Sequence, residues 1–513
     1  MVCKSGIENG GSNMLRSSLI ISVIIIFITS FASATVINIP SDYESIQDGI
    51  NAASPGDTVL VAEGTYYERI NFYGKNIFLT SEFINDEDSS HIYNTIIDAD
   101  TSVLGIADTA TAVTFENAEN SNCVLQGFTI TNGIGTAFQP HYRLGGGINC
   151  SFFTSPTIIN NIIINNSAGV GGGICCLVNC NPVIRGNIIG PNEGQGIYLS
   201  GSAPIIENNV IEGNGASSYG GGIFCNGASD ATISRNIIRS NDGGLWGGGI
   251  LCVASNPLIT NNVFYRNQAY DWGGGICCDA SSPTIVNNTI SSNVAFSSGG
   301  GLFCLNGAAP TVINTIFWND GPDEIDTRSG GMPAVSYSNI LGGWQGEGNM
   351  NIDPLFRDPE NNDFHLMATY CGDTDDSPCI DMGDPSIDED LISCDWGLGT
   401  EHSDMGAYGG ATDTTTAVDE PPSALPASVA LYQNYPNPFN ASTNFAFDLP
   451  RGNYTELSIY NLMGRKITTL VDNYFQAGTH RVSWDASDFA SGVYFYKLSA
   501  GDETFTKRMI LLK

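Results

Sequence analysis

Asparagine recurs at two positions of a repeating unit, and this register constrains the fold more than any other feature of the chain. Both series have successive intervals of 26, 22, 27, 26, 26 and 26 residues. The first is Asn161, Asn187, Asn209, Asn236, Asn262, Asn288 and Asn314; the second is Asn166, Asn192, Asn214, Asn241, Asn267, Asn293 and Asn319. Matched series require one structural unit of about 26 residues that is stacked on itself.

Each unit contains a glycine block and three short apolar runs, separated by Gly, Asn and Pro. Runs of three to six residues are too short for helices and suit strands. Ile and Val dominate them, which favours a pleated surface. Three strands and three turns per unit predict one coil of a parallel β-helix, a solenoid whose coils pair strand on strand. The glycine blocks are Gly145–Gly147, Gly171–Gly173, Gly220–Gly222, Gly247–Gly249, Gly273–Gly275 and Gly299–Gly301, with a degraded copy at Gly194 to Gly196.

The repeat also predicts what lies inside and at the turns. Asparagine at a turn tolerates a left-handed backbone, and its amide can bond the amide one coil away. Two columns are expected to point inward. One is Ile148, Ile174, Ile197, Ile223, Ile250, Ile276 and Leu302; the other is Cys150, Cys176, Leu199, Cys225, Cys252, Cys278 and Cys304.

The strong repeats cover residues 145–320, and weaker coils are expected on both sides. Earlier strands are predicted at 59–61, 70–72, 77–79, 95–97 and 124–131, and residues 335–410 are interpreted as closing coils. Ile46, Ile50 and Ala53 fall on one face of an amphipathic helix, which we expect to cap the N-terminal end of the core.

The N-terminus has the pattern of a secretory signal. Arg16 supplies a positive charge, Leu19 to Phe31 an apolar stretch, and Ala32-Ser33-Ala34 a cleavage motif. We therefore expect residues 1–34 to be a signal peptide, cleaved after Ala34, with Met14 as an alternative start. An uncleaved anchor is the other interpretation. The apolar stretch is short for a bilayer span, and no second hydrophobic segment follows, so the mature chain is expected to lack a membrane-spanning segment.

Cysteine spacing argues against a general disulfide framework. The column cysteines occupy the inward position that Leu199 fills in one coil, so they are expected to be buried, reduced thiols. Cys371, Cys379 and Cys394 lie in a loop-rich acidic stretch, and one pair among them is the best disulfide candidate. No paired CxxC motif exists, which makes a zinc site improbable.

The net charge is −34, from 53 acidic and 19 basic residues. Such a balance argues against nucleic acid and against anionic lipid. It suits an exported protein and weak Ca²⁺ binding, although solubility alone explains it. The acidic loops Asp373 to Asp376 and Asp384 to Asp390 lack the spaced carboxylates of a calcium loop, so no cofactor is expected and Ca²⁺ stays a weak alternative.

The composition changes near Ala411. Residues 411–426 are rich in Thr, Pro, Ser and Ala and are interpreted as a linker. Residues 427–513 show six alternating strand-like runs, at 443–447, 455–460, 465–471, 480–484, 492–498 and 505–512. They predict a small antiparallel, immunoglobulin-like β-sandwich.

The sandwich segment carries a recognisable set of motifs. Tyr432 to Asn440 (YQNYPNPFN) contains the core Tyr435, Pro436, Asn437, Pro438 and Phe439, and the chain ends on KRMILLK with Lys513 last. This segment resembles the C-terminal sorting domains of type IX secretion cargo. The resemblance implies export guided by this domain, contact with an outer-membrane secretion machinery, and a bacterial cell-surface or extracellular location.

The N-terminal part also resembles known proteins. Ser45 to Ala53 (SIQDGINAA), GDTVLV from Gly56 and GTY from Gly64 are similar to the opening of right-handed β-helix proteins, which include pectate-lyase-like and pectinesterase-like enzymes and many non-enzymes. DPLF from Asp353, SPCID from Ser377 and DMGAY from Asp404 resemble the closing segment of secreted β-helix proteins. The resemblance covers roughly residues 40–410 and implies fold better than chemistry.

The repeats show no convergent catalytic cluster, so enzyme activity is left uncertain and is not favoured. Arg239 and Arg266 occupy nearly the same register in adjacent coils, but the nearest acidic residues are scattered over different registers. Those residues are Glu207, Glu212, Asp230 and Asp242. No Asp cluster recurs at 26-residue spacing, and no Ser-His-Asp spacing stands out.

Aromatic residues are the more suggestive feature. Tyr219, Trp246 and Trp272 each precede a glycine block, so three consecutive coils are expected to place them in one surface column. Flat aromatic faces suit sugar rings, and Tyr270, Asp242 and Asp271 are candidate rim groups. The structural alternative is that stacked aromatics only stabilise the solenoid.

An outward column beside them, Asn149, Cys175, Tyr198, Phe224, Leu251, Cys277 and Phe303, is unusually apolar. It is either covered by a loop or tail or serves as a contact surface.

These observations predict a right-handed parallel β-helix at residues 35–410, joined to a sorting sandwich. The hypothesis for its role is non-catalytic polysaccharide binding or adhesion, with Tyr219, Trp246, Trp272, Tyr270 and Asp271 as the site. The alternatives are a polysaccharide lyase or glycoside hydrolase, and a structural surface-layer component.

Overall fold

The computed structural model describes residues 34–100, 102, 110–139, 142–389, 391–410 and most of 429–511. In the last range, 432–433, 435–436, 438, 441, 450–452, 463, 476–477, 488 and 502 are left out. The signal peptide apart from Ala34, the linker, Tyr435, Pro436, Pro438 and Lys513 lie outside the described residues. The chain forms two compact units, Met1–Thr414 and Thr415–Lys513.

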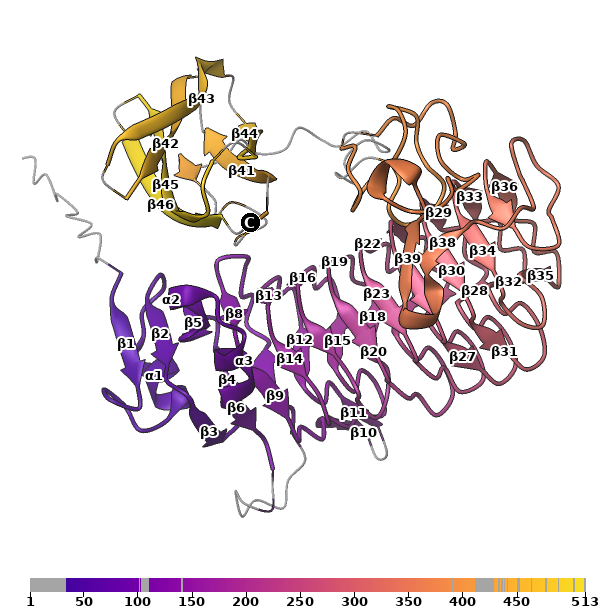
Figure 1. Ribbon diagram of the computed structural model, residues 1–513. Coiled ribbons are helices and arrows are strands. Elements are labelled where there is room, and N and C mark those ends of the chain that lie inside the picture. The colour runs from indigo at the N-terminus through magenta and orange to yellow at the C-terminus, as the bar shows by residue number, and fades with distance from the viewer. Residues whose placement is uncertain are drawn as a thin grey trace, which may run out of the picture. The chain divides into compact units, whose positions relative to one another are not determined.

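The first unit is a right-handed parallel β-helix built from three sheets (Figure 1). Sheet A has 12 strands among the described residues: β1 Val36–Ile39, β2 Thr58–Val61, β5 Phe78–Ser81, β8 Val124–Gln126, β13 Thr157–Ile159, β16 Val183–Arg185, β19 Ile205–Glu207, β22 Thr232–Ser234, β25 Leu258–Thr260, β29 Thr284–Val286, β33 Thr311–Ile313 and β36 Ala334–Ser336.

The other two sheets complete each coil. Sheet B runs β3 Gly64–Tyr67, β6 Thr95–Asp98, β9 Thr129–Thr131, β14 Ile162–Ile163, β17 Ile188–Ile189, β20 Val210–Glu212, β23 Ile237–Arg239, β26 Val263–Tyr265, β30 Thr289–Ser291, β34 Ile316–Trp318 and β37 Asn339–Ile340. Sheet C runs β4 Ile70–Asn71, β7 Val113–Phe115, β12 Ile148–Ser151, β15 Ile174–Leu177, β18 Ile197–Ser200, β21 Ile223–Asn226, β24 Ile250–Val253, β28 Ile276–Asp279, β32 Leu302–Leu305 and β35 Ile325–Thr327. The strands predicted before residue 145 are confirmed by β2, β4, β5, β6, β8 and β9.

The core lies inside the coil and follows the predicted columns. The Ile148 and Cys150 columns are fully buried, and each member pairs with its counterpart one coil away, as in Cys150 with Cys176. The column cysteines are free thiols. Burial raises the pKa of the Cys150 thiol well above its usual value, so this side chain stays protonated and acts as a small apolar group.

The asparagines form two hydrogen-bonded ladders that run along the turns on either side of sheet B. Asn161 Nδ2 donates to Asn187 Oδ1 at 3.1 Å, and the Asn161 backbone N–H donates to the same oxygen at 3.0 Å. The second N–H of the amide satisfies a backbone carbonyl, that of Leu125 for Asn161. The bond from Nδ2 to the Oδ1 of the next coil repeats along both ladders as far as Asn262 and Asn267, which donate to Asn288 and Asn293. Because each amide donates toward the next coil, the ladders have a direction.

The assignment of Asn314 and Asn319 to these ladders is wrong. The coil from Thr289 to Ile316 is 27 residues long, as the pairing of these two residues shows, so the ladder positions fall on Thr315 and Asp320. Asn288 N–H donates to Thr315 Oγ1, and Asn293 donates to Asp320 Oδ1. Asn314 and Asn319 occupy the preceding positions, which have a left-handed backbone with φ of 51° and 64°. A purely sequential count could not detect this one-residue shift, because Asn occurs at both positions.

A third ladder, of hydroxyl groups, was not predicted. It follows the turn between sheets C and A. The backbone N–H of Ser229 donates to Ser255 Oγ at 3.1 Å, and Ser255 N–H donates to Ser281 Oγ at 3.1 Å. Upstream members are Thr154, Cys180 and Ser202. Because Thr154 and Cys180 stand where the later coils have Ser, the residue type carries a weaker signal than asparagine does.

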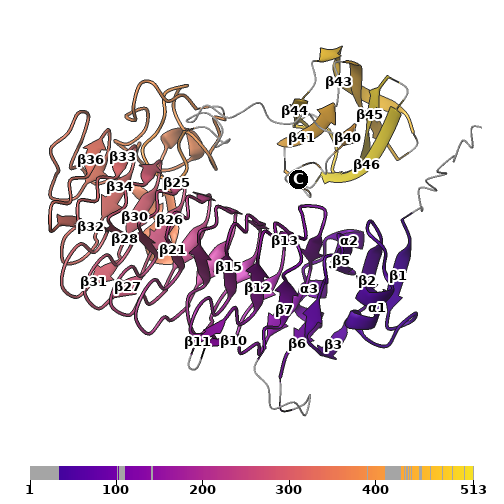
Figure 2. The ribbon, with the colours of Figure 1, turned by 180° about the vertical axis from the view of Figure 1, so that it is seen from behind.

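The predicted cap helix is α1, Ile46–Ala52, which closes the N-terminal end of the solenoid (Figure 2). Ile46 and Ile50 are fully buried against the first coil. The Glu68 carboxylate accepts from the Ile46 and Gln47 N–H groups, and Lys75 Nζ donates to carbonyls at the other end, including that of Ala53. Both helix ends are thus neutralised by charges of the appropriate sign. At the opposite end of the core lies Trp344.

Residues 353–410, here called the cover, do not form closing coils, so that part of the prediction is wrong. The cover contains β38 Phe356–Asp358, the turn Pro359–Asn361, β39 Asp363–Leu366 and the turn Thr369–Cys371. It packs back onto the outer face of sheet B, where Phe364, Leu366 and Met405 join Val263 and Ile316 in one apolar cluster. Figure 1 shows the cover beside β30 and β34.

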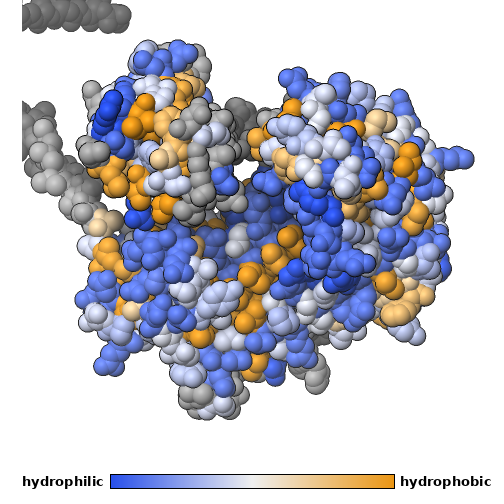
Figure 3. Space-filling view, in the orientation of Figure 1, coloured by the Kyte–Doolittle hydropathy of each residue, from blue (hydrophilic) through white to orange (hydrophobic). Residues whose placement is uncertain are grey.

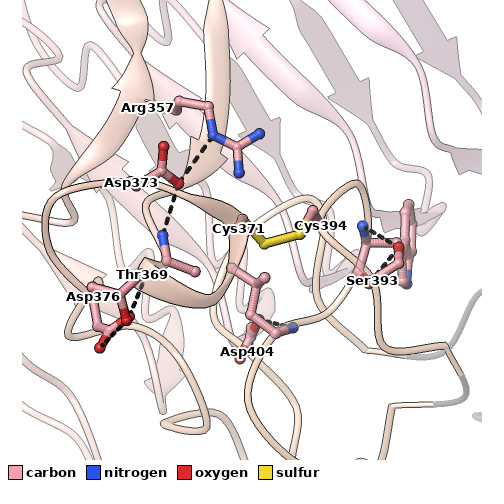
Figure 4. Close-up of a disulfide and its surroundings, with 11 residues drawn as sticks. Arg357, Thr369, Cys371, Asp373, Asp376, Ser393, Cys394 and Asp404 are labelled. Atoms are coloured by element: carbon pink, nitrogen blue, oxygen red, sulfur yellow. Dashed lines mark hydrogen bonds and ion pairs between the residues drawn. A yellow bond between two sulfur atoms is a disulfide. The ribbon is translucent and has the colours of Figure 1, made fainter.

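The cover is fastened by the left-handed asparagines of the last coils. Asn261 Nδ2 donates to the Gly409 carbonyl at 2.7 Å, Asn287 Nδ2 to that of Asp404 at 2.8 Å, and Asn314 Nδ2 to Ser403 Oγ at 3.0 Å. One disulfide joins Cys371 to Cys394 inside the cover, with Cα atoms 5.6 Å apart (Figure 4). It is one of the pairs that the sequence left open, and Cys379 stays free.

The second unit is the predicted sandwich. A three-stranded sheet contains β40 Ala430–Leu431, β41 Ser442–Leu449 and β44 Gly478–Asp485; a four-stranded antiparallel sheet contains β43 Lys466–Phe475, β42 Asn453–Asn461, β45 Gly492–Ala500 and β46 Glu503–Leu511. Phe445, Leu457 and Tyr496 form its core. Of the opening motif, Asn437 Oδ1 accepts from the Ile510 N–H, and Phe439 is buried beside Trp484.

Candidate functional site

A row of exposed apolar side chains marks the corner of the solenoid between sheets B and C. Four consecutive coils contribute Tyr219, Leu245, Tyr270 and Phe296, with exposed fractions of 39%, 37%, 66% and 70%. We call these four residues the ridge. The Tyr270 and Phe296 rings lie 6.1 Å apart, tilted by 49°. Figure 3 shows hydrophobic atoms on the surface beside β27 Gln268–Ala269 and β31 Val294–Ala295, the two short strands of this corner.

Backbone pairing fixes the spacing of Tyr270 and Phe296, which directly follow β27 and β31, whereas Tyr219 shares its register with Trp246. Strand β27 pairs with β31 in parallel, and further bridges join Tyr219 to Trp246 and Trp246 to Trp272. The glycine blocks make the corner compact. At Gly221, for example, an added Cβ would lie 2.6 Å from the Gly248 carbonyl oxygen. Ridge side chains therefore stand on a rigid, closely packed turn.

The two predicted site tryptophans are only partly exposed. Trp246 and Trp272 are half-buried, with ring centroids 5.0 Å apart and planes 25° apart, and Trp272 also stacks on Phe303 at 5.2 Å and 12°. Tyr219 meets Trp246 edge-on, at 62°. The ring faces that would meet a sugar are engaged by neighbouring rings, so the three aromatics do not form one coplanar platform.

These tryptophans explain the apolar outward column of sheet C. Leu251, Cys277 and Phe303 are fully buried, and Trp246 and Trp272 pack against them. Turn residues of the same coils therefore cover these members of the column. The covering groups are the side chains that the sequence had placed in a binding surface.

Polar groups border the ridge. Gln268 Nε2 donates to Asp242 Oδ2 at 2.8 Å, and Asp242 Oδ1 accepts from the Gly244 N–H. Asp271, which lies between Tyr270 and Trp272 in the sequence, is half-buried. The predicted rim residues Tyr270, Asp242 and Asp271 thus lie at one corner.

Phe296 and Leu245 were missed. Phe296 stands three residues before its glycine block, the same offset as Tyr270 before Gly273. An alignment of the coils on their glycine blocks would have placed Phe296 beside Tyr270. Leu245 gives no such signal, because an isolated exposed leucine is ordinary.

A second set of groups with catalytic potential lies on sheet B. The register pairs Glu212 with Arg239 and Arg239 with Tyr265. Arg239 Nε lies 2.5 Å from Glu212 Oε2, and Arg239 Nη1 lies 2.7 Å from the Tyr265 hydroxyl. Of the scattered acidic residues, Glu212 is thus the one that shares the register of Arg239 on sheet B. Tyr265 is only 3% exposed, and Arg239 binds both Glu212 and Tyr265.

Arg266 is not part of this trio. It occupies a left-handed turn position, and its guanidinium carbon lies 6.0 Å from the centre of the Tyr265 ring. Glu207 likewise pairs with arginines, Arg185 and Arg235. These ion pairs brace sheets A and B.

The cover holds two buried carboxyl groups. Burial, with a contribution from Asp404, raises the pKa of Glu389 to about 8, and burial raises the pKa of Asp404 to about 7. Glu389 Oε1 accepts from the Asp404 N–H at 2.7 Å, whereas Oε2 has no hydrogen-bond partner among the described residues. Asp404 accepts from the N–H groups of Asp381 and Leu398. These contacts tie the loops of the cover together.

The acidic loops considered for Ca²⁺ bind protein groups. Asp373 accepts from Arg357 and from the Ala368 N–H, and Asp376 accepts from Thr369 (Figure 4). Within the described ranges, no group of three or more His, Cys, Asp or Glu side chains is arranged to hold a metal ion. No helix in the same ranges is long and apolar enough to cross a bilayer.

Comparison with protein families identifies both units. Residues 83–253 and 146–317 match the family model of the right-handed β-helix region. Residues 433–512 match that of the secretion system C-terminal sorting domain.

Two solved structures are similar to the chain in part. The crystal structure of pectate lyase Pel9A shares 15% identity and a TM-score of 0.41, over 74% of this chain and 97% of that one. A mutant of the PL6-family alginate lyase AlyGC shares 12% identity and a TM-score of 0.33, over 66% of this chain and 56% of that one. Comparison with curated proteins gives no match. The chain is a right-handed parallel β-helix protein with a type IX C-terminal sorting domain, which directs it to the cell surface or the extracellular space.

Proposed function

We propose that the solenoid binds polysaccharide without cleaving it, and that the ridge is the contact surface. The observation that carries this proposal is the pair of exposed rings, Tyr270 and Phe296, on adjacent coils of a rigid corner. Their position outside the cell, which the sorting domain provides, brings them into contact with extracellular and cell-wall glycans.

Exposed aromatic side chains suit sugars for two reasons. An apolar ring face packs against the C–H face of a sugar, while hydroxyl groups at the sugar rim need hydrogen-bond partners nearby. The Asp242–Gln268 pair and Asp271 supply such partners beside the rings. Little ordering is required on binding, because backbone pairing already fixes the corner.

The test is a glycan-array screen of the full-length secreted chain, with analysis of released products. The double variant Tyr270→Ala/Phe296→Ala should lose at least tenfold in affinity. The control Phe152→Ala/Phe153→Ala removes two rings of 60% and 62% exposure from another turn of the same solenoid and should bind normally. Equal binding by both double variants, or absence of any retained glycan, contradicts the proposal.

Replacement of Trp246 and Trp272 is not a clean test of binding. Both rings cover buried side chains of sheet C, so their loss should unfold coils before it reports on a ligand. Release of shortened glycans during the screen would favour a lyase or hydrolase instead. In that case Glu212 and Arg239 are the groups to replace, because they are the closest carboxylate–arginine pair beside an aromatic hydroxyl.

A further inference from the structure

The charges around the ridge restrict the class of glycan that it can take. Residues 35–410 contain 42 acidic and nine basic residues. A surface of this balance repels polyanions, most strongly at low ionic strength, where screening is weak and charges act over longer distances.

The local charges agree with the overall balance. Asp242 and Asp271 belong to the ridge corner itself. Asp326, on β35, bonds the hydroxyl of Ser298, which is paired with Trp272. Three carboxylates therefore lie on or beside the corner.

The basic residues of the same coils face other partners. Arg239 is engaged by Glu212, and Arg266 lies over Tyr265 on sheet B. Arg328 is the basic residue that lies near the ridge corner. Its guanidinium carbon is 5.5 Å from the Trp272 ring centre and 5.7 Å from that of Phe303. It is outnumbered by the three carboxylates.

We infer that the ridge selects uncharged polysaccharide and discriminates against chains that carry carboxylate or sulfate groups. This inference rests on the proposed function and adds a ligand class to it. An uncharged chain can stack on Tyr270 and Phe296 with no electrostatic cost. A uronate chain must bring a negative charge beside Asp242 and Asp271 at each contact.

The first readout is the charge of the glycans that the wild-type chain retains on the array and the Tyr270→Ala/Phe296→Ala variant does not. Uncharged glycans should dominate that set. The second readout uses matched probes in the presence of a calcium chelator: methyl-esterified against de-esterified polygalacturonan, and cello-oligosaccharides against the same chains oxidised to glucuronic acid.

For each backbone that binds, the carboxylated form should bind at least about fivefold more weakly at low salt, and the difference should fall below about twofold at high salt. The variant Asp242→Asn/Asp271→Asn should also reduce the difference in affinity between the uncharged and the carboxylated form. Equal or tighter binding of carboxylated chains, especially if Arg328→Gln abolishes it, overturns the inference and leaves the proposed function intact. Retention that does not depend on Tyr270 and Phe296 overturns both.

Discussion

The coils and the cover belong to one compact unit, but different chemistry holds them together. Residues 145–320 contain eight acidic and four basic residues, whereas the cover contains 15 acidic residues and a single arginine. Coil contacts repeat between neighbours 22 to 27 residues apart, while the asparagines that fasten the cover reach 89 to 148 residues along the chain. In the coils, repetition lets the amide side chains of neighbouring coils satisfy one another's hydrogen-bonding groups. The cover has no such repeat and is held together by a disulfide and by carboxylates that accept backbone N–H groups. The coils should therefore be insensitive to redox conditions and respond to pH mainly at their C-terminal end, where burial raises the pKa of Asp320 well above its usual value, whereas the cover should respond to both.

The largest expected effect tests the amide ladders. Asn241 is fully buried, its Oδ1 accepts two hydrogen bonds from Asn214, and its Nδ2 donates to Ile211 and Asn267. Asn241→Ala leaves several buried groups unpaired and should lower the free energy of unfolding by about 3–5 kcal/mol. Urea denaturation followed by circular dichroism measures it. The exposed Asn256→Ala should cost less than about 1 kcal/mol. Equal costs would show that the ladders add nothing specific.

A glycine pair tests how tightly the coils are packed. In Gly221→Ala the new Cβ meets the backbone of the next coil, which should cost about 1–3 kcal/mol. In Gly215→Ala nothing lies within 4 Å of the new atom, and the backbone has no positive φ. That control should change stability by about 0.5 kcal/mol or less. A reversed order would mean that the corner is looser than described.

The disulfide confines the redox response to the cover. Cys371→Ser/Cys394→Ser opens a loop with a sequence separation of 23 residues, which should weaken the cover by roughly 3 kcal/mol. Hydrogen exchange should accelerate at Met405 and Gly406, whose N–H groups bond Cys379 and Asn314, and should be unchanged at Asn241. Faster exchange throughout the coils would contradict the division between the two regions.

The smallest effect is on pH dependence. Because the pKa values of Glu389 (about 8) and Asp404 (about 7) are raised by folding, the folded cover binds more protons than the unfolded one. Its stability is complete at about pH 4 and declines as the pH rises through 8. Exchange of cover amides, corrected for the intrinsic rate, should therefore accelerate between pH 5 and 8. Glu389→Gln should flatten that dependence, and a profile unchanged in this variant would exclude Glu389 as the cause.

The repeated region could be predicted from sequence because its information is redundant. Each coil places similar residues at its turns, at its inward positions and at its outward positions. The sheets, the Ile148 and Cys150 columns and most ladder asparagines therefore follow from the period. Prediction from the period failed at Asn314. One residue is inserted in that coil, and the asparagine that precedes the ladder position then falls at the expected 26-residue interval. Prediction from the period also failed for the cover, because a sequence repeat holds no information about contacts between residues as distant in the chain as Asn261 and Gly409.

The ridge was predictable only in part, for a physical reason. Period and register place Tyr219, Trp246, Tyr270 and Trp272 at one corner, but they do not decide which rings turn inward. That choice depends on whether the neighbouring outward column leaves space, and small residues such as Cys277 give the tryptophans room to pack.

The direction of the asparagine ladders has a consequence for how proteins of this kind change length. Between Asn166 and Asn293, the bonds that each coil receives are of the same kind as those it passes on, so a whole coil could be duplicated or deleted in frame without leaving an amide unmatched. The lone 22-residue coil from Asn187 to Asn209 shows that even its size can vary. At Asp320 the second series ends on a carboxyl group that accepts from Asn293. Growth by tandem copying should therefore be confined to the interior of the array.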